Sequence, residues 1–389
     1  MASIGFIGVG KLGQACAEMV AEVHDVVGYD VNHVEPENFT MVDNMEDAVK
    51  KQDIVFISVP TPHDPQYDGK APTSHLPNKD FDYSVVKDVL AKVNAVATKE
   101  QLIVLISTVL PGTVRREFIP LLTNTRFVYN PYLIAMGTVK WDMVNPEMVM
   151  IGTRDGSETG DAKELVDFYK TIMQNDPRYI IGTWDECECI KVFYNTFISA
   201  KVSLVNMIQD VAEKQGNINA EVVCDALADC DRRIMGPSYM KPGMGDGGAC
   251  HPRDNIALSW LARKLDLSYD WYESLMICRE KQTDWLADLM EEHDLPKVIL
   301  GRAFKPETNI VVGSPAVLLR NILNERGHDV VMYDPRLGDE LPEFEASCFL
   351  IGCKHPEFAE FDFPEGSIVI DPHRYVKEKP GVTVIHIGG

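Results

Sequence analysis

The residues best suited to chemistry lie near position 245, where the chain reads GDGGACHPRDNIAL. Three glycines, with Gly247 the middle one, come just before Cys250, and glycine lets a backbone adopt positive φ and approach a ligand closely. Pro252 predicts that a helix begins only after it, at Asn255, so the thiol is expected on a tight loop that leads into a helix. Backbone N–H groups at a helix N-terminus favour a thiolate, and Asp254 follows one turn later.

A nucleophilic cysteine and a buried structural cysteine both fit this stretch. Free cysteine is among the most buried residue types, so a packed thiol on a glycine turn is a real alternative. The clustering of glycine, cysteine and aspartate favours chemistry there, but it leaves both interpretations open until the rest of the chain is considered.

The composition excludes several classes of partner. The 389 residues suffice for two or three domains, and the formal net charge is −22. Nucleic acid and anionic membranes are therefore not expected as partners of this surface. No apolar run is long enough to span a bilayer, and the chain begins directly with a strand rather than a signal segment. A site for an anionic substrate must supply its own lysine and arginine residues.

The nine cysteines are scattered and show no zinc spacing, so no metal site is expected. Free thiols indicate a reducing compartment, and together with the missing signal segment they predict a cytoplasmic protein.

The N-terminus predicts a dinucleotide-binding domain. A strand at 3–8 leads into GVGKLG, a helix at 14–22 and a second strand at 25–30. The motif G-x-G-x-x-G is weak alone and specific in this strand–turn–helix–strand context. A domain that binds another nucleotide, or none, is the alternative.

Each part of that motif has a physical role. Gly8 makes the turn, Gly10 admits the pyrophosphate and Gly13 lets helix and strand pack. Asp30 ends the second strand, where it can bond the adenosine ribose hydroxyls. No arginine follows it to hold a 2′-phosphate, so NAD is favoured over NADP. The predicted cofactor-binding residues of this turn are Gly8, Gly10, Lys11, Leu12, Gly13 and Asp30.

Further buried strands are predicted at 53–59, 102–107 and 127–129, with a helix at 83–96 and another opening at Pro111. Ligands of open α/β sheets bind beyond the carboxyl ends of such strands. Thr61, Thr108 and Asn130 lie at those ends and are candidate ligand contacts. Ordinary turn chemistry explains isolated threonine and asparagine residues equally well.

A long helix is predicted from 185 to about 215, with further helical segments near 219–230 and 255–290. Lys191 and Asn195 are four residues apart and share one face of the long helix, where they suggest a site. A solvated stripe is the alternative for this pair. The apolar content of the region indicates a subunit interface.

A second α/β unit follows Pro296. Strands are predicted at 297–301, 329–334, 347–352, 367–371 and 382–387, and Ser314 is predicted to cap a helix that begins at Pro315 and ends at Gly327. The fold class is therefore α/β, with two Rossmann-like, doubly wound parallel-sheet domains joined by a long central helix and a helical dimerisation region. The expected division is 1–183, 184–292 and 293–389.

The motifs resemble those of the UDP-glucose/GDP-mannose dehydrogenase family over nearly the whole chain, most closely the members that act on UDP-glucose. The matching stretches are GFIGVGKLG, VPTP, STVLPGTV, IKVFYNTFISAKVSLVN, GDGGACHPRDNIAL, GRAFKPETNIVVGSP and VVMYDP. The resemblance implies a homodimer that oxidises UDP-glucose to UDP-glucuronate in two steps, transferring four electrons to two NAD molecules. GDP-mannose or a UDP-N-acetylhexosamine as substrate, and a homologue with impaired catalysis, are the alternatives.

The resemblance also implies roles for particular residues. Cys250 matches the family nucleophile, Asp254 its companion acid, and Lys191 and Asn195 the pair on the central helix. The remaining matches are Thr108 of the STV motif, Gly247 of the cysteine loop, Lys305 of the F-K-P loop and, with shifted spacing, Arg233 and Arg374 as contacts of the sugar nucleotide.

The chain departs from the family pattern at two places. Tyr132 and Met136 stand where the family has glutamates, and the first of those glutamates is implicated in thioester hydrolysis, which here would fall to Asp254 and an ordered water. Ile310 and Val312 replace an aspartate and an arginine in the F-K-P loop, a change that bears on which sugar nucleotide fits.

Overall fold

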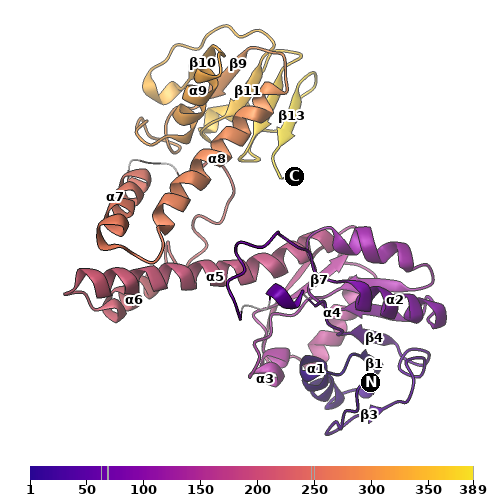
Figure 1. Ribbon diagram of the computed structural model, residues 1–389. Helices are drawn as coiled ribbons and strands as arrows, with labels where there is room; N and C mark the ends of the chain where they lie inside the picture. The colour runs from indigo at the N-terminus through magenta and orange to yellow at the C-terminus, as the bar shows by residue number, and fades with distance from the viewer. Residues whose placement is uncertain (63, 68–69, 247, 249, 389) are drawn as a thin grey trace. The chain divides into compact units, whose positions relative to one another are not determined.

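The computed structural model describes residues 1–62, 64–67, 70–246, 248 and 250–388. The chain forms two compact units, Met1–Ala200 and Lys201–Gly389 (Figure 1). Each unit contains one sheet, and the two predicted α/β domains are confirmed. The finer division at residues 183 and 292 stays a prediction.

An eight-stranded sheet forms the centre of the first unit. All neighbouring strands pair in parallel except β6 and β7, which are antiparallel. The spatial order is β3 (Thr40–Met41), β2 (Asp25–Tyr29), β1 (Ser3–Ile7), β4 (Ile54–Ile57), β5 (Leu102–Leu105), β6 (Arg126–Tyr129), β7 (Met148–Thr153) and β8 (Arg178–Thr183). The order reverses between β1 and β4, which is the switch point where such sheets bind ligands.

Helices cover both faces of this sheet because its strands are apolar on both sides. One face packs against α1 (Lys11–Ala21), α3 (Val139–Val144) and α4 (Asp161–Ile172). The other face packs against α2 (Ser84–Val96), the π-helical turn η2 (Val114–Phe118) and the start of α5 (Trp184–Gln215). Short 3₁₀ turns complete the unit at η1 (Pro65–Tyr67) and η3 (Ile119–Leu121).

Two helices of this unit were not anticipated from the sequence. In α4 the buried side chains are Ala162, Leu165, Phe168, Tyr169 and Ile172, a clear helical periodicity that was available to find it. The helix α3 has only six residues and carries no comparable signal. The helix expected to open at Pro111 is instead the π-helical turn η2, followed directly by η3.

The second unit begins within α5 and continues through α6 (Ala220–Ala228), α7 (Cys250–Leu265) and α8 (Trp271–Glu291). Its sheet is wholly parallel, in the order β10 (Val330–Tyr333), β9 (Lys297–Leu300), β11 (Cys348–Ile351), β12 (Ile368–Asp371) and β13 (Thr383–His386). One face packs against α8 and α9 (Pro315–Glu325). The other carries an aromatic cluster that includes the turn η5 (Pro356–Phe358), and η4 (Pro335–Leu337) follows β10.

One helix boundary and one predicted helix cap differ from expectation. The helix α7 begins at Cys250 and not after Pro252, because a proline in the first helical turn sacrifices no intrahelical hydrogen bond. Ser314 does precede Pro315 at the start of α9, but its side chain makes no capping hydrogen bond. Among the described residues, every helix is too short or too polar to traverse a lipid bilayer.

Candidate active site

The turn between β1 and α1 needs glycine for a different reason at each position. Gly8 has φ +88°, and a Cβ there would lie 2.6 Å from the carbonyl oxygen of Ser58. A Cβ on Gly13 would lie 2.0 Å from the carbonyl oxygen of Gly8, so helix and strand approach each other too closely for any side chain. At Gly10, in contrast, no described atom lies within 4 Å of the Cβ position. The turn therefore leaves open space at the N-terminus of α1.

That space belongs to a cavity of about 820 Å³ at the carboxyl edge of the first sheet. The predicted residues that line it are Gly8, Gly10, Lys11, Leu12, Gly13, Asp30, Thr61, Thr108 and Lys191. Its volume is in the range of ligand pockets, and the free backbone N–H groups at the start of α1 suit a phosphate. No side chain caps α1. The residues present therefore fit a dinucleotide.

Two backbone N–H groups hold the carboxylate of Asp30 at the rim of the cavity. Its Oδ2 accepts a hydrogen bond from the N–H of Val9 at 2.8 Å, and its Oδ1 accepts one from the N–H of Asn32 at 2.8 Å. These bonds fix the carboxylate at the end of β2, where a ribose hydroxyl of a dinucleotide is expected.

The ends of β4 and β5 are tied together beside the cavity. The hydroxyl of Thr61 donates to the carbonyl of Thr108 at 2.7 Å, and Ser107 donates to the carbonyl of Val59 at 2.5 Å. The two predicted threonines therefore share one wall of the cavity.

Lys191 reaches the same cavity from α5. Its Nζ donates to the carbonyl oxygen of Tyr132 at 2.7 Å, and burial lowers the pKa of its ammonium group below the usual lysine value. Asn195 follows one turn later on α5; it is exposed and does not line the cavity. Of the predicted pair, only the lysine belongs to this wall.

Asn130 lies elsewhere than expected. It is fully buried, its amide donates to the carbonyl of Met150 at 2.6 Å, and its Oδ1 accepts from the hydroxyl of Tyr169. It does not line the large cavity, so the described geometry shows no ligand contact for its side chain. The position of Asn130 at a strand end could not reveal this burial. The direction of its side chain depends on the elements that pack beside the strand.

Tyr132 continues the same buried network. Its hydroxyl lies 2.9 Å from that of Tyr169, and burial raises its pKa well above the usual tyrosine value. Its phenol is therefore bonded into the core and is unsuited to replace the family glutamate as a base.

The second unit carries the cysteine. Cys250 is the first residue of α7 and its side chain is exposed. Asp254 lies one turn further along, and its Oδ1 accepts a hydrogen bond from Nε of Arg253 at 2.8 Å. Gly247 lies outside the described residues.

The three other predicted substrate contacts also belong to the second unit. Lys305 is exposed, and its Nζ lies 5.3 Å from the ring centroid of Phe304. Arg374 has φ +53°, and its guanidinium donates to the carbonyl of Gly388 at 3.1 Å. Arg233 is exposed in the turns after α6. Their joint action with the residues of the first unit stays a prediction.

Sequence reasoning missed a buried acid. Glu188 lies on α5 three residues before Lys191 and is fully buried. Its two carboxylate oxygens accept the N–H groups of Gly112 at 2.5 Å and Val114 at 2.6 Å, and burial raises its pKa to about 7. An acid among apolar residues of a long helix was the available signal.

Comparisons with known proteins define the class. The chain matches the NAD binding domain of the UDP-glucose/GDP-mannose dehydrogenase family over residues 32–173 and the central domain of that family over residues 185–281. These ranges cover more than half of the sequence. The chain therefore belongs to this family of NAD-dependent sugar-nucleotide dehydrogenases.

Individual relatives carry two different names. A GDP-mannose 6-dehydrogenase of Pseudomonas aeruginosa is 29% identical over 370 residues, covering 85% of this chain and 80% of the relative. A UDP-glucose 6-dehydrogenase of Haloferax volcanii is 26% identical, covering 97% and 98%. The crystal structure of a ternary complex of GDP-mannose dehydrogenase from Pseudomonas aeruginosa has the same fold, with a TM-score of 0.84, 23% identity and 99% of each chain covered.

Proposed function

We propose that this protein oxidises the primary alcohol of a nucleotide sugar to a carboxylate, with UDP-glucose as substrate and UDP-glucuronate as product. The supporting observation is the position of Lys191, a partly buried ammonium group on the wall of the cavity that fits NAD. A cation there suits an alcohol that becomes an alkoxide during oxidation.

The glycine turn and Asp30 would hold NAD, which accepts the hydride when bound. A water takes the hydroxyl proton of the substrate, Asp254 is the proposed acid that accepts it, and the lysine cation stabilises the alkoxide. Thr108 supports the same wall through its bond with Thr61.

Cys250 prepares the aldehyde for the second oxidation. Its sulfur forms a bond to the aldehyde carbon, and Lys191 and Asn195 stabilise the resulting oxyanion. The hydride of this thiohemiacetal carbon would pass to a second bound NAD, and with the oxygen deprotonated a thioester carbonyl results. Water then attacks the carbonyl carbon, the C–S bond breaks and the thiolate leaves. Because Tyr132 and Met136 replace the family glutamates, Asp254 is assigned to that water.

The exposed residues Lys305, Arg233 and Arg374 are proposed to bind the anionic sugar nucleotide. They supply the local positive charge that a chain of net charge −22 must provide for such a ligand. The role of Gly247 as a substrate contact stays a prediction, because this residue lies outside the described residues. Asn130, whose side chain is bonded into the core, is not assigned a direct contact with the substrate.

GDP-mannose is the second candidate substrate, because relatives that bear the name GDP-mannose 6-dehydrogenase match this chain. The test is a panel of UDP-glucose, GDP-mannose and UDP-N-acetylhexosamines with measurement of NADH formed per sugar. Two NADH indicate complete oxidation, one indicates arrest at the aldehyde, and none with every sugar contradicts the proposal.

The nucleophile is tested by C250S, with C278S, another exposed cysteine, as the matched control. We expect C250S to lose about 10³-fold or more in turnover. Mass spectrometry of the wild type after a single turnover should detect an adduct on the peptide that contains residue 250. Normal turnover by C250S would contradict the assignment.

A homodimer built on α5 is part of the proposal. Large apolar side chains are exposed along this helix: Phe193, Phe197, Ile198, Val202, Leu204 and Val205. Such a patch is typical of a protein interface. Light scattering of the wild type should give twice the monomer mass, and F197E should reduce it.

A further inference from the structure

Two loops that are distant in sequence contact each other within the second unit. The first is the segment before Cys250, and the second is the loop 304–313, which we call the FKP loop. The N–H of Gly248 donates to the carbonyl of Gly313 at 3.2 Å. A Cβ on Gly248, whose φ is +108°, would lie 3.1 Å from the ring of Phe304. Gly248, two residues before the cysteine, therefore contacts both ends of the FKP loop.

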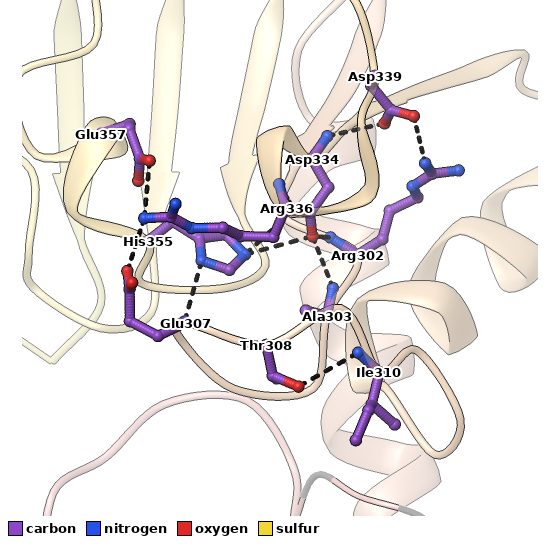
Figure 2. A network of polar contacts seen from close by, with 10 residues as sticks. All are labelled: Arg302, Ala303, Glu307, Thr308, Ile310, Asp334, Arg336, Asp339, His355 and Glu357. Atoms are coloured by element: carbon purple, nitrogen blue, oxygen red, sulfur yellow. Dashed lines mark hydrogen bonds and ion pairs between the residues drawn. The ribbon is translucent and has the colours of Figure 1, made fainter.

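The middle of the FKP loop is held by polar contacts at Glu307 (Figure 2). Glu307 has φ +59°, a conformation that a residue with a side chain keeps only where its surroundings enforce it. Its N–H donates to Nδ1 of His355 at 3.4 Å, and its carboxylate pairs with Arg336 at 2.8 Å. His355 is thus the buried contact of the strained residue.

His355 is itself fixed by a carboxylate. Nε2 of His355 lies 3.2 Å from Oδ1 of Asp334, and both side chains are fully buried. Because Nδ1 accepts the N–H of Glu307, the ring proton belongs on Nε2 and points to Asp334. Oδ2 of Asp334 also accepts the N–H groups of Arg302 at 2.7 Å and Ala303 at 2.8 Å, the two residues before the FKP loop.

We propose that the Asp334–His355 pair is a positioning device for the nucleophile, acting through the FKP loop on the segment before Cys250. Asp334 fixes the backbone of the two residues that connect β9 to the FKP loop. His355 fixes the middle of the loop at Glu307, and the two ends of the loop contact Gly248. The consequence for catalysis rests on the proposed role of Cys250, whereas the mechanical coupling does not.

The coupling is tested by amide hydrogen exchange of the full-length protein, followed by mass spectrometry of peptides. H355Q removes the Nδ1 acceptor of Glu307, because the glutamine amide takes the place of Nε2 beside Asp334. E307P removes both the N–H and the positive φ. In both we expect exchange over 243–250 to become about three- to tenfold faster, the change that the loss of one hydrogen bond produces. E307P changes a surface loop and serves where H355Q does not fold.

Two matched variants separate this coupling from general loosening. E307G keeps the N–H and tolerates positive φ, so exchange over 243–250 should stay within about twofold of the wild type. H328Q removes a histidine that pairs with Glu291 at 2.7 Å in the same unit, and it should have no effect on that segment. Faster exchange confined to 304–313 in H355Q and E307P would overturn the proposal.

A kinetic measurement then distinguishes failure of the coupling from failure of the proposed function. If the wild type oxidises a nucleotide sugar, E307P should raise KM for the sugar nucleotide and lower kcat while KM for NAD stays unchanged. Equal changes in both KM values would contradict a positioning role. If the wild type oxidises no sugar nucleotide, the exchange result still decides the coupling by itself.

Discussion

The ammonium group of Lys191 donates a hydrogen bond to the backbone carbonyl of Tyr132 at 2.7 Å, joining α5 to a loop 59 residues earlier in the chain. This bond aims the lysine into the cavity and satisfies one of its three donors. Two N–H donors remain for a ligand. The arrangement explains how a tyrosine can stand in place of the family glutamate without loss of the lysine position, since only the backbone of residue 132 is used.

Replacement of Lys191 by alanine is expected to lower kcat by about 10²–10³-fold, because one donor to the developing oxyanion is lost. The midpoint of thermal unfolding should change little. K201A, an exposed lysine on the same helix, is the control and should retain full activity. A K191A variant with wild-type kcat would exclude the lysine from the chemistry.

The lowered pKa of Lys191 also predicts a pH effect. Above that pKa the ammonium loses its proton, so kcat should fall with rising pH before an exposed lysine would titrate. Arginine stays protonated throughout this range, so K191R should lack the alkaline decline even if its activity is low. Identical alkaline limbs in the two pH profiles would contradict this role.

The open space at Gly10 predicts that a substitution there weakens NAD binding and leaves the stability of the fold unchanged. G10A fits the protein, but its methyl group would occupy the approach of the pyrophosphate, so Kd for NAD should rise about tenfold or more with an unchanged unfolding midpoint. G13A is the matched comparison. Its methyl group would lie 2.0 Å from a carbonyl oxygen, so we expect a loss of about 1–3 kcal/mol in the free energy of unfolding. Titration calorimetry and urea unfolding measure the two effects.

Removal of the Tyr132 hydroxyl should affect stability and leave catalysis intact. Y132F loses one hydrogen bond to Tyr169, which is worth about 1 kcal/mol. Its kcat and its NADH yield per sugar should equal those of the wild type. A Y132F enzyme that accumulates acyl-enzyme would show that this phenol takes part in hydrolysis after all.

Glu188 predicts a pH dependence of stability. Its pKa is raised from 4.5 in the unfolded chain to about 7 in the fold, so the unfolded state loses its proton first as pH rises. The free energy of unfolding should therefore decrease between about pH 4.5 and 7, by at most about 3 kcal/mol from this group. E188Q, which cannot ionise, should flatten that slope in urea unfolding at pH 5 and 7.5. An E188Q variant with the slope of the wild type would exclude Glu188 as its source.

Local patterns predicted most of the fold. The five strands of the second sheet, strands β1, β2, β4, β5 and β6 of the first sheet and the long helix α5 were predicted because apolar runs and helical spacing are properties of neighbouring residues. The G-x-G-x-x-G turn was also found locally, since its requirement for glycine at 8 and 13 follows from the close meeting of one strand with the next helix. The break between α7 and α8, where Asp266 has φ +52°, was not predicted, because the apolar periodicity continues on both sides of it.

The direction and burial of individual side chains depend on the tertiary structure. The sequence alone determined the alternation of strands and helices in both units, apart from β3, α3 and α4, together with the cofactor turn and the choice of Cys250, Lys191 and Asp30 as candidates. These features depend on residue type and short spacing. Only the tertiary structure decided that Asn130 is turned into the core, that Glu188 holds Gly112 and Val114, and that His355 supports Glu307. Each of those contacts joins residues at least 20 positions apart, and only the packing of the folded chain brings such residues within hydrogen-bonding distance.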